Sequence, residues 1–189
     1  LLVRIVAVFG ASAIAGYTIA IRIIVFVLLP AWGLSNAAAT LVGQNLGAGL
    51  PERAEKSVWI TGYINMILMG LIGMILIIFP HNFIQIFITD PEVVSQGVIA
   101  LRIISIGFIF YGLGMVMIQA FNGSGDTVTP SIINFTGYWL IEIPLAWLLA
   151  IGMKLNLEGA CIAIVIAETL VAIIALLLFR KGKWKLQKV

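Results

Sequence analysis

The chain has 189 residues, of which 62% are hydrophobic and only 10% are charged. A soluble domain of this size could not keep such a composition in solution, so a polytopic membrane protein is expected. The single cysteine, Cys161, excludes both a disulfide framework and a cysteine metal site. The net charge of +3 does not indicate a nucleic-acid partner, because five of the eleven basic residues crowd between Arg180 and Lys188.

Long apolar runs follow one another with almost no polar chain between them, and none alternates with a period of two. A backbone that spans a membrane must satisfy its own hydrogen bonds, so these runs are expected to be helices. We therefore predict an all-α transmembrane bundle of five complete helices, forming a single domain over residues 1–189. The helices are expected at about 12–46, 57–79, 91–121, 130–153 and 158–179. Leu1 to Phe9 is too short to span and is expected to be the end of a truncated sixth helix.

Prolines and helix caps set the first of these boundaries. Pro30 and Gly33 predict a kink in the first span. Pro80 ends the second span, and residues 81–92 are expected to form a partly apolar interfacial loop. Asp90 is the expected N-cap of the third span, with Pro91 at its first position.

Turn formers separate the third span from the fourth. They gather from Asn122 to Asp126, too densely for a helix to continue. Thr129 and Pro130 then restart the chain as a helix by the same capping logic. Pro144 lies inside this fourth span, where its missing N–H predicts a bend. Pro30 and Pro144 are candidate pivots for a rocking lobe, with static kinks as the alternative.

The basic tail, residues 180–189, predicts the orientation, because Lys and Arg near membrane ends are retained on the cytoplasmic side. The C-terminus is therefore expected in the cytoplasm. Counting back through the spans places Arg53 and Lys56 on the same side, while Lys154 falls outside. Trp184 is expected to anchor the tail at the membrane interface.

The segment 31–49 (AWGLSNAAATLVGQNLGAG) combines small and polar residues. Asn36, Thr40 and Gln44 recur at a spacing of four, so they share one helix face, and the alanines beside them allow close helix approach. Glycines at its end permit a sharp turn.

This segment resembles a helix end and loop of the MATE family of multidrug and toxin extrusion transporters. Later stretches resemble further landmarks of that family in the same order: 88–93 (ITDPEV), 120–130 (AFNGSGDTVTP), 139–146 (WLIEIPLA) and 157–160 (LEGA). The positions that carry the resemblance most directly are Gly43, Gln44, Asn45, Gly47, Gly123, Gly125, Asp126 and Pro144. Together these stretches cover nearly the whole chain.

The resemblance implies a transporter of twelve helices in two halves, of which this chain is similar to the second. It implies a multi-pass protein of a bacterial or archaeal cell membrane that exchanges an organic, often cationic, compound for a sodium ion or a proton. The implied partners are membrane lipids, small organic substrates and the missing N-terminal lobe, with no further cofactor. One branch of the family has a cation-binding acid in the third helix counted here, where this chain has Gly112, Leu113 and Gly114, so that site is absent.

Four charged residues are expected at membrane depth, away from the helix ends: Arg22, Arg102, Glu142 and Glu168. A charge near the bilayer centre costs at least about 2.5 to 3.5 kcal/mol, so such groups usually face a bundle interior or a wet cavity. Glu142 and Glu168 are therefore candidate substrate or coupling-cation ligands. The alternative pairs each glutamate with an arginine as a structural ion pair. For the arginines, such pairing or a reach toward the outer interface is the favoured interpretation.

Polar stripes add further candidates. Asn134 and Tyr138 precede Glu142 at a spacing of four, which predicts a cavity face on the fourth helix. Asn65 ends a similar stripe on the second helix, where hydrogen bonding between helices is an equal alternative. Gln119 is also a candidate cavity residue.

Catalytic motifs are absent from the sequence, so an enzyme is not expected. Two rivals to the efflux antiporter remain open. A lipid-linked oligosaccharide flippase of the same superfamily would need several cationic side chains for a pyrophosphate, and only Arg22 and Arg102 qualify. A membrane assembly module without transport would tolerate replacement of Glu142 and Glu168.

Overall fold

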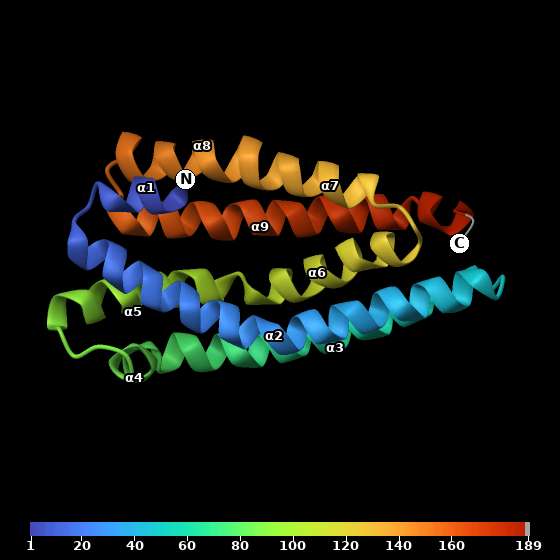
Figure 1. The fold of residues 1–189 in the computed structure, drawn as a ribbon, viewed down its shortest axis with the longest axis horizontal. Helices are drawn as coiled ribbons and strands as arrows, with labels where there is room; N and C mark the ends of the chain where they lie inside the picture. Colours follow the sequence, from blue (N-terminus) through green and yellow to red (C-terminus); the bar gives the residue numbers. More distant parts are fainter. Residues whose placement is uncertain (188–189) are drawn as a thin grey trace.

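The computed structural model describes residues 1–187 and begins with a short helix, α1 (Leu2–Ala7), followed by the long helix α2 (Ala11–Gly47). α2 is helical throughout, including Pro30, and Figure 1 shows it bending near the middle of its length, in keeping with the kink expected at Pro30 and Gly33. Pro30 is exposed, and its missing N–H removes only one of the many backbone bonds of a helix about 55 Å long.

Helix α3 (Pro51–Ile78) pairs with α2 through a tight turn. Gly49 adopts a φ of 72° in this turn, a conformation that favours glycine. α3 begins at Pro51, whereas the sequence predicted a start at residue 57. Proline is favoured in the first turn of a helix. A short helix, α4 (Pro80–Gln85), then occupies part of the stretch predicted as a loop.

The third predicted helix consists of two helices, α5 (Pro91–Ile106) and α6 (Phe108–Gly123), which meet at Gly107 with a bend of 55°. The expected N-cap is confirmed: a side-chain oxygen of Asp90 accepts hydrogen bonds from the backbone N–H groups of Glu92 (2.9 Å) and Val93 (3.2 Å). The bend was not predicted, since no proline marks it.

The fourth predicted helix is continuous but changes its winding. It comprises α7 (Val128–Asn134), the π-helix η1 (Phe135–Glu142), α8 (Ile143–Trp147) and the π-helical turn η2 (Leu148–Gly152). η1 ends two residues before Pro144. We attribute the wider turn to the proline ring, which would clash with the carbonyl of the preceding turn of an ordinary α-helix.

The last long helix is α9 (Asn156–Arg180), followed by a 3₁₀ turn, η3 (Lys183–Leu186). Figure 1 shows α7, α8 and α9 along one side of the bundle and α2 and α3 along the other, with α6 between them, while α5 overlaps the first part of α2 in this view. α6 contacts α2, α3 and α9 and so connects the two sides.

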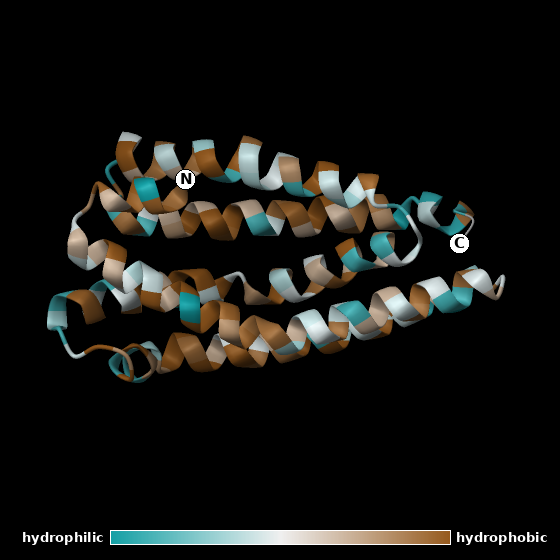
Figure 2. Cartoon of the chain, viewed as in Figure 1, coloured by the Kyte–Doolittle hydropathy of each residue, from teal (hydrophilic) through white to brown (hydrophobic). Residues whose placement is uncertain are grey.

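Four helices are long and apolar enough to cross a membrane, or five if α5 and α6 form one bent span. In Figure 2, hydrophobic residues dominate the length of these helices, and hydrophilic residues gather at the turns and near the C-terminus. The turns form two ends, which we call the tail end (residues 47–51, 124–127 and 181–187) and the far end (residues 8–10, 79–90 and 153–155). The all-helical membrane bundle predicted from the sequence is confirmed.

Candidate functional site

Two glutamates from neighbouring helices form the centre of the candidate site. Glu142 is the last residue of η1 and is only 7% exposed, while Glu168 lies at the middle of α9 and is half-buried. Their carboxylates are close enough to interact electrostatically. Both lie deep within helices long enough to span a bilayer, so two carboxyl groups share a water-poor region.

Three tyrosines surround these carboxylates. The Tyr138 hydroxyl approaches the Glu168 carboxylate from η1. Tyr17 of α2 lies within electrostatic range of Glu142, and Tyr111 of α6 lies within range of both glutamates. We call these five residues the acidic cluster. Its phenol O–H groups are donors that can orient a carboxylate without neutralising it.

Basic side chains do not neutralise the acidic cluster. Within residues 1–187 neither Glu142 nor Glu168 forms an ion pair, and the one salt bridge joins Lys185 to Glu55. Arg22 and Arg102 are both exposed on the bundle surface. The alternative in which each glutamate is paired with an arginine is therefore wrong for the described chain.

A cavity of about 440 Å³ opens beside Glu142. Tyr17, Tyr138 and Trp139 line it together with Ile143 and the start of the chain, residues 1–3. Apart from the Glu142 carboxylate and the two phenols, the lining side chains are apolar or aromatic. Such a lining suits a molecule that is mostly apolar and carries a positive charge.

The π-helical segment brings the fourth helix very close to α9. A Cβ atom added to Gly137 would collide with the side chain of Val171, so only glycine fits here without movement. Val171 lies one turn from Glu168, and Gly137 lies within η1 before Glu142. Close packing at Gly137 thus helps to hold the two carboxylates together. On the preceding turn, the buried Oδ1 of Asn134 has no hydrogen-bond partner among the described residues.

Asn65 and Gln119, also predicted as cavity residues, have protein partners elsewhere. Asn65 is fully buried, and its Nδ2 donates a hydrogen bond to the carbonyl oxygen of Gly112 at 2.9 Å. Gln119 donates from Nε2 to Oδ1 of Asn36 at 2.7 Å and accepts from Nδ2 of Asn122 at 2.6 Å. The structure thus places Asn65 in hydrogen bonding between helices, and Gln119 in a polar link between α2 and α6.

The motif residues gather at the tail end, with the exception of Pro144. A Cβ on Gly123 would lie 2.7 Å from the Cα atom of Ala39, and one on Gly43 would lie 3.1 Å from the Gly123 carbonyl oxygen. These glycines therefore let α2 and α6 approach closely. Gly125 adopts a φ of 84° in the turn that follows. Gln44 and Gly47 are exposed, and Asn45 donates from Nδ2 to the Leu41 carbonyl at 2.7 Å within its own helix.

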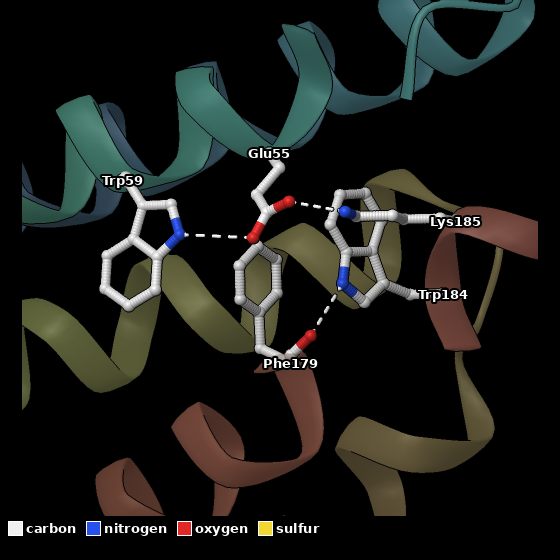
Figure 3. Close-up of polar contacts among 5 residues, drawn as sticks. All are labelled: Glu55, Trp59, Phe179, Trp184 and Lys185. Carbon is white, nitrogen blue, oxygen red and sulfur yellow. Dashed lines mark hydrogen bonds and ion pairs between the residues drawn. The ribbon is translucent and has the colours of Figure 1, made fainter. Parts of the chain in front are cut away.

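The C-terminal segment folds back onto the bundle (Figure 3). Trp184 is 1% exposed, stacks on Phe179 with ring centroids 4.7 Å apart, and donates from Nε1 to the Phe179 carbonyl at 3.0 Å. Lys185 forms an ion pair with Glu55 of α3, which also accepts a hydrogen bond from Trp59. The prediction of Trp184 as an interface anchor is wrong, because its ring is enclosed by protein.

Sequence reasoning found the two glutamates, Tyr138 and Asn134 of the site but missed Tyr17 and Tyr111. Both tyrosines lie within apolar runs on helices far from α9 in sequence, and Tyr111 directly follows Phe110. No spacing rule places them beside a carboxylate of another helix. Only the packing of α2 and α6 on the rest of the bundle reveals them.

The sequence and the fold of this chain are both similar to those of known transporters. The family model MatE matches residues 1–148. A probable multidrug resistance protein NorM of Thermotoga maritima is 31% identical over 176 residues, which are 93% of this chain and 38% of that protein. A transporter of the MOP superfamily from Pyrococcus furiosus has a similar fold, with a TM-score of 0.92 at 21% identity over 100% of this chain and 42% of that one.

A second solved structure, the outward-facing conformation of a multidrug resistance MATE family transporter, gives a TM-score of 0.91 at 20% identity. The match covers 99% of this chain and 42% of that one. The chain thus spans less than half the length of these relatives. The match to the family model extends over most of the sequence, including η1 and Glu142. This chain belongs to the MatE family.

Proposed function

We propose that the chain is one lobe, the second, of a multidrug efflux antiporter that works by alternating access. The whole protein would export organic cationic compounds in exchange for sodium ions or protons. The relatives named above are more than twice as long, so the other lobe would supply the opposite wall of the transport pathway. In this proposal the protein lies in the cell membrane of a bacterium or archaeon, with its C-terminus in the cytoplasm.

The observation that carries this proposal is the unneutralised acidic cluster. Two carboxyl groups on separate helices lie within electrostatic range of each other at membrane depth, without a basic partner in the described chain, so they repel each other whenever both are ionised. A proton, a sodium ion or a cationic substrate relieves that repulsion, and only one of them need be bound at a time. Exchange of one cation for another at the same carboxylates is the chemical basis of antiport.

Aromatic residues support a cationic substrate. Tyr17, Tyr138 and Trp139 line the cavity together with Glu142, and aromatic faces attract cations. The cavity of about 440 Å³ lies in the range of small-molecule sites. In our proposal Asn134 and Tyr138 orient the bound cation, and the glutamates hold its charge.

The two rival functions fit this geometry less well. A flippase for a pyrophosphate-linked lipid needs cationic side chains around its groove, but the residues that line the cavity beside Glu142 include no arginine or lysine. A membrane assembly module without transport gives no reason for two neighbouring glutamates that form no ion pair with a basic residue in the described chain. It predicts instead that their replacement affects stability alone.

The test is gradient-driven efflux by the full-length protein. Ethidium, a fluorescent organic cation, would be loaded into proteoliposomes, and its transport measured with a sodium gradient, with a proton gradient and with neither. We expect Glu142→Gln to reduce gradient-driven transport at least about tenfold. Glu158→Gln is the matched control, because Glu158 is an exposed glutamate at the start of α9.

The outcomes separate the candidate functions. Efflux that depends on one gradient identifies the coupling ion. Normal gradient-driven efflux after Glu142→Gln, with the variant correctly folded, would falsify the role of this carboxylate. Loss of transport in the Glu158→Gln control would show that the assay reports general damage to α9.

A further inference from the structure

An apolar cavity with a single arginine lies on the outside of the bundle, at the far end. It has a volume of about 380 Å³. Ile23, Phe26 and Val27 of α2 form one wall. The opposite wall comes from α4 and the turn after it, through Phe83, Ile86 and Phe87. Arg22 is the one charged residue among the described residues that line this cavity.

The depth of Arg22 matches the level of lipid headgroups. α2 has 37 residues and is therefore about 55 Å long, which exceeds the hydrocarbon core of about 30 Å by roughly 25 Å. Arg22 lies about 16 Å along α2 from its start at the far end. If the excess length is shared between the two ends, Arg22 lies near the boundary between hydrocarbon and headgroups. Phe26 and Val27 lie deeper, toward the centre of the bilayer.

Arg22 has no protein partner for its charge in the described chain. It is exposed, and within residues 1–187 it forms neither an ion pair nor a side-chain hydrogen bond. Around it the side chains are bulky and apolar, and several are unusually accessible: Phe26 is 73% exposed and Ile86 is 74% exposed. A guanidinium beside a large open apolar surface needs a ligand that is anionic at one end and apolar along its length.

We propose that this cavity binds a phospholipid with an anionic headgroup. The Arg22 guanidinium donates two parallel hydrogen bonds to the lipid phosphate, a geometry that matches its fork of N–H groups. One acyl chain then runs inward between Phe26 of α2 and Phe87, covering the exposed apolar side chains. We call this the Arg22 lipid site. It is separate from the acidic cluster and does not depend on the proposed transport function.

The lining decides between kinds of occupant. A free phosphate ion would satisfy Arg22 but leave the apolar walls uncovered. An uncharged apolar molecule would cover the walls and leave the guanidinium without a partner. Among phospholipids, an anionic headgroup is preferred over phosphatidylethanolamine, because the ammonium group of the latter would be repelled by Arg22.

The test measures lipid bound to the delipidated full-length protein by native mass spectrometry, with phosphatidylglycerol and phosphatidylethanolamine as probes. We expect a preference of roughly tenfold for phosphatidylglycerol at one site. Arg22→Gln should lose this preference, and Arg22→Lys should retain most of it because the charge remains. Arg102→Gln is the matched control, since Arg102 is an exposed membrane arginine outside this cavity.

Two further measurements test whether the acyl chain contacts the cavity. Phe26→Ser should weaken the binding of both lipids to a similar extent, because it removes apolar contact and leaves the charge in place. Inorganic phosphate at millimolar concentration should not displace phosphatidylglycerol. The proposal is overturned if Arg22→Gln binds phosphatidylglycerol as tightly as the natural protein, if Arg102→Gln loses binding equally, or if phosphate alone displaces the lipid.

Discussion

Asn65 and Gly112 join α3 to α6 through both side chain and backbone. The Asn65 Nδ2 donates to the Gly112 carbonyl oxygen at 2.9 Å. A Cβ added to Gly112 would lie 2.7 Å from the carbonyl oxygen of Asn65. The two helices are thus in backbone contact at this level. In the sequence, Gly112 marks only the absence of an acidic residue, whereas in the structure it is a close-packing position.

Gly112→Ala should therefore destabilise the protein. The added methyl group meets backbone atoms that cannot rotate away, so α3 and α6 must separate, at a cost of about 1 to 3 kcal/mol. The measurement is thermal unfolding of the purified full-length protein in detergent. Gly33→Ala is the matched control, because nothing lies within 4 Å of a Cβ at that helical position. Equal melting temperatures for the two variants would contradict the close contact.

Asn65→Ala tests the side-chain half of the same link. Asn65 is fully buried, and its amide also lies 3.5 Å from both the Ala31 carbonyl and Ser35 Oγ of α2. Removing it breaks a connection among three helices and leaves a small cavity, so we expect a loss of about 1 to 3 kcal/mol in unfolding free energy. Ser35→Ala should cost much less, because Ser35 Oγ donates to a carbonyl of its own helix. A larger loss for Ser35→Ala would show that Asn65 is not the main link.

Much of the fold was predictable because long apolar runs leave a membrane chain few choices. Proline and Asp caps then placed the start of α5 at Pro91, as the structure confirms. The bend at Gly107 and the π-helical segment η1 were not predictable in this way. The bend at Gly107 depends on which helix packs against which, and a local sequence pattern does not specify that. Pro144 predicted a bend in the fourth helix but not the π-helical winding before it.

Some residues of the candidate site were also predictable from the sequence, and others were not. Glu142 and Glu168 stand out in the sequence, because a charge within an apolar run is costly wherever the helix faces. Their mutual proximity and the approach of Tyr17 and Tyr111 arise from tertiary packing, as does the tight fit of Gly137 against α9. The sequence therefore identifies the two acidic residues, whereas their arrangement relative to each other and to the tyrosines requires the structure.

Asp126 should make stability depend on pH at the acidic end. Its Oδ1 accepts from the Thr129 backbone N–H at 3.0 Å, and its Oδ2 accepts from the Thr129 hydroxyl at 2.6 Å. Partial burial raises the pKa of Asp126, but these hydrogen bonds outweigh it, so the pKa lies below its ordinary value of 3.8. The stabilisation is therefore complete above about pH 3.8 and is lost as the pH falls through the lower folded-state pKa.

Asp126→Asn is the variant that measures this effect. It should be less stable than the natural protein at pH 6, by an amount toward the low end of the range of about 0.5 to 2 kcal/mol for lost helix caps. The difference should shrink as the pH is lowered below the ordinary aspartate pKa, because the natural carboxylate becomes protonated. Unfolding curves of both proteins in detergent over this range give the comparison. A difference that stays constant down to the lowest pH would show that the carboxylate charge plays no part.

Trp184→Ala should detach the C-terminal segment from the bundle. The indole is 1% exposed, packs against Phe179 and holds η3 beside α3, where Lys185 reaches Glu55 (Figure 3). Loss of a buried tryptophan costs about 3 to 5 kcal/mol in a tight core. We expect the lower limit, because η3 packs on the surface of the bundle and can separate from α3 without leaving a closed cavity.

Trp147→Ala provides the comparison for this last variant. Trp147 is 56% exposed on α8, so its removal should cost far less despite the same change in side-chain volume. Limited proteolysis adds a local readout, since trypsin should cut after the exposed Lys181 and Lys183 faster in Trp184→Ala than in Trp147→Ala. Trp184 would then be a packing residue that ties the basic tail to α3. If both variants were cleaved at the same rate, the contacts of the indole with Phe179 would not be what holds the segment in place.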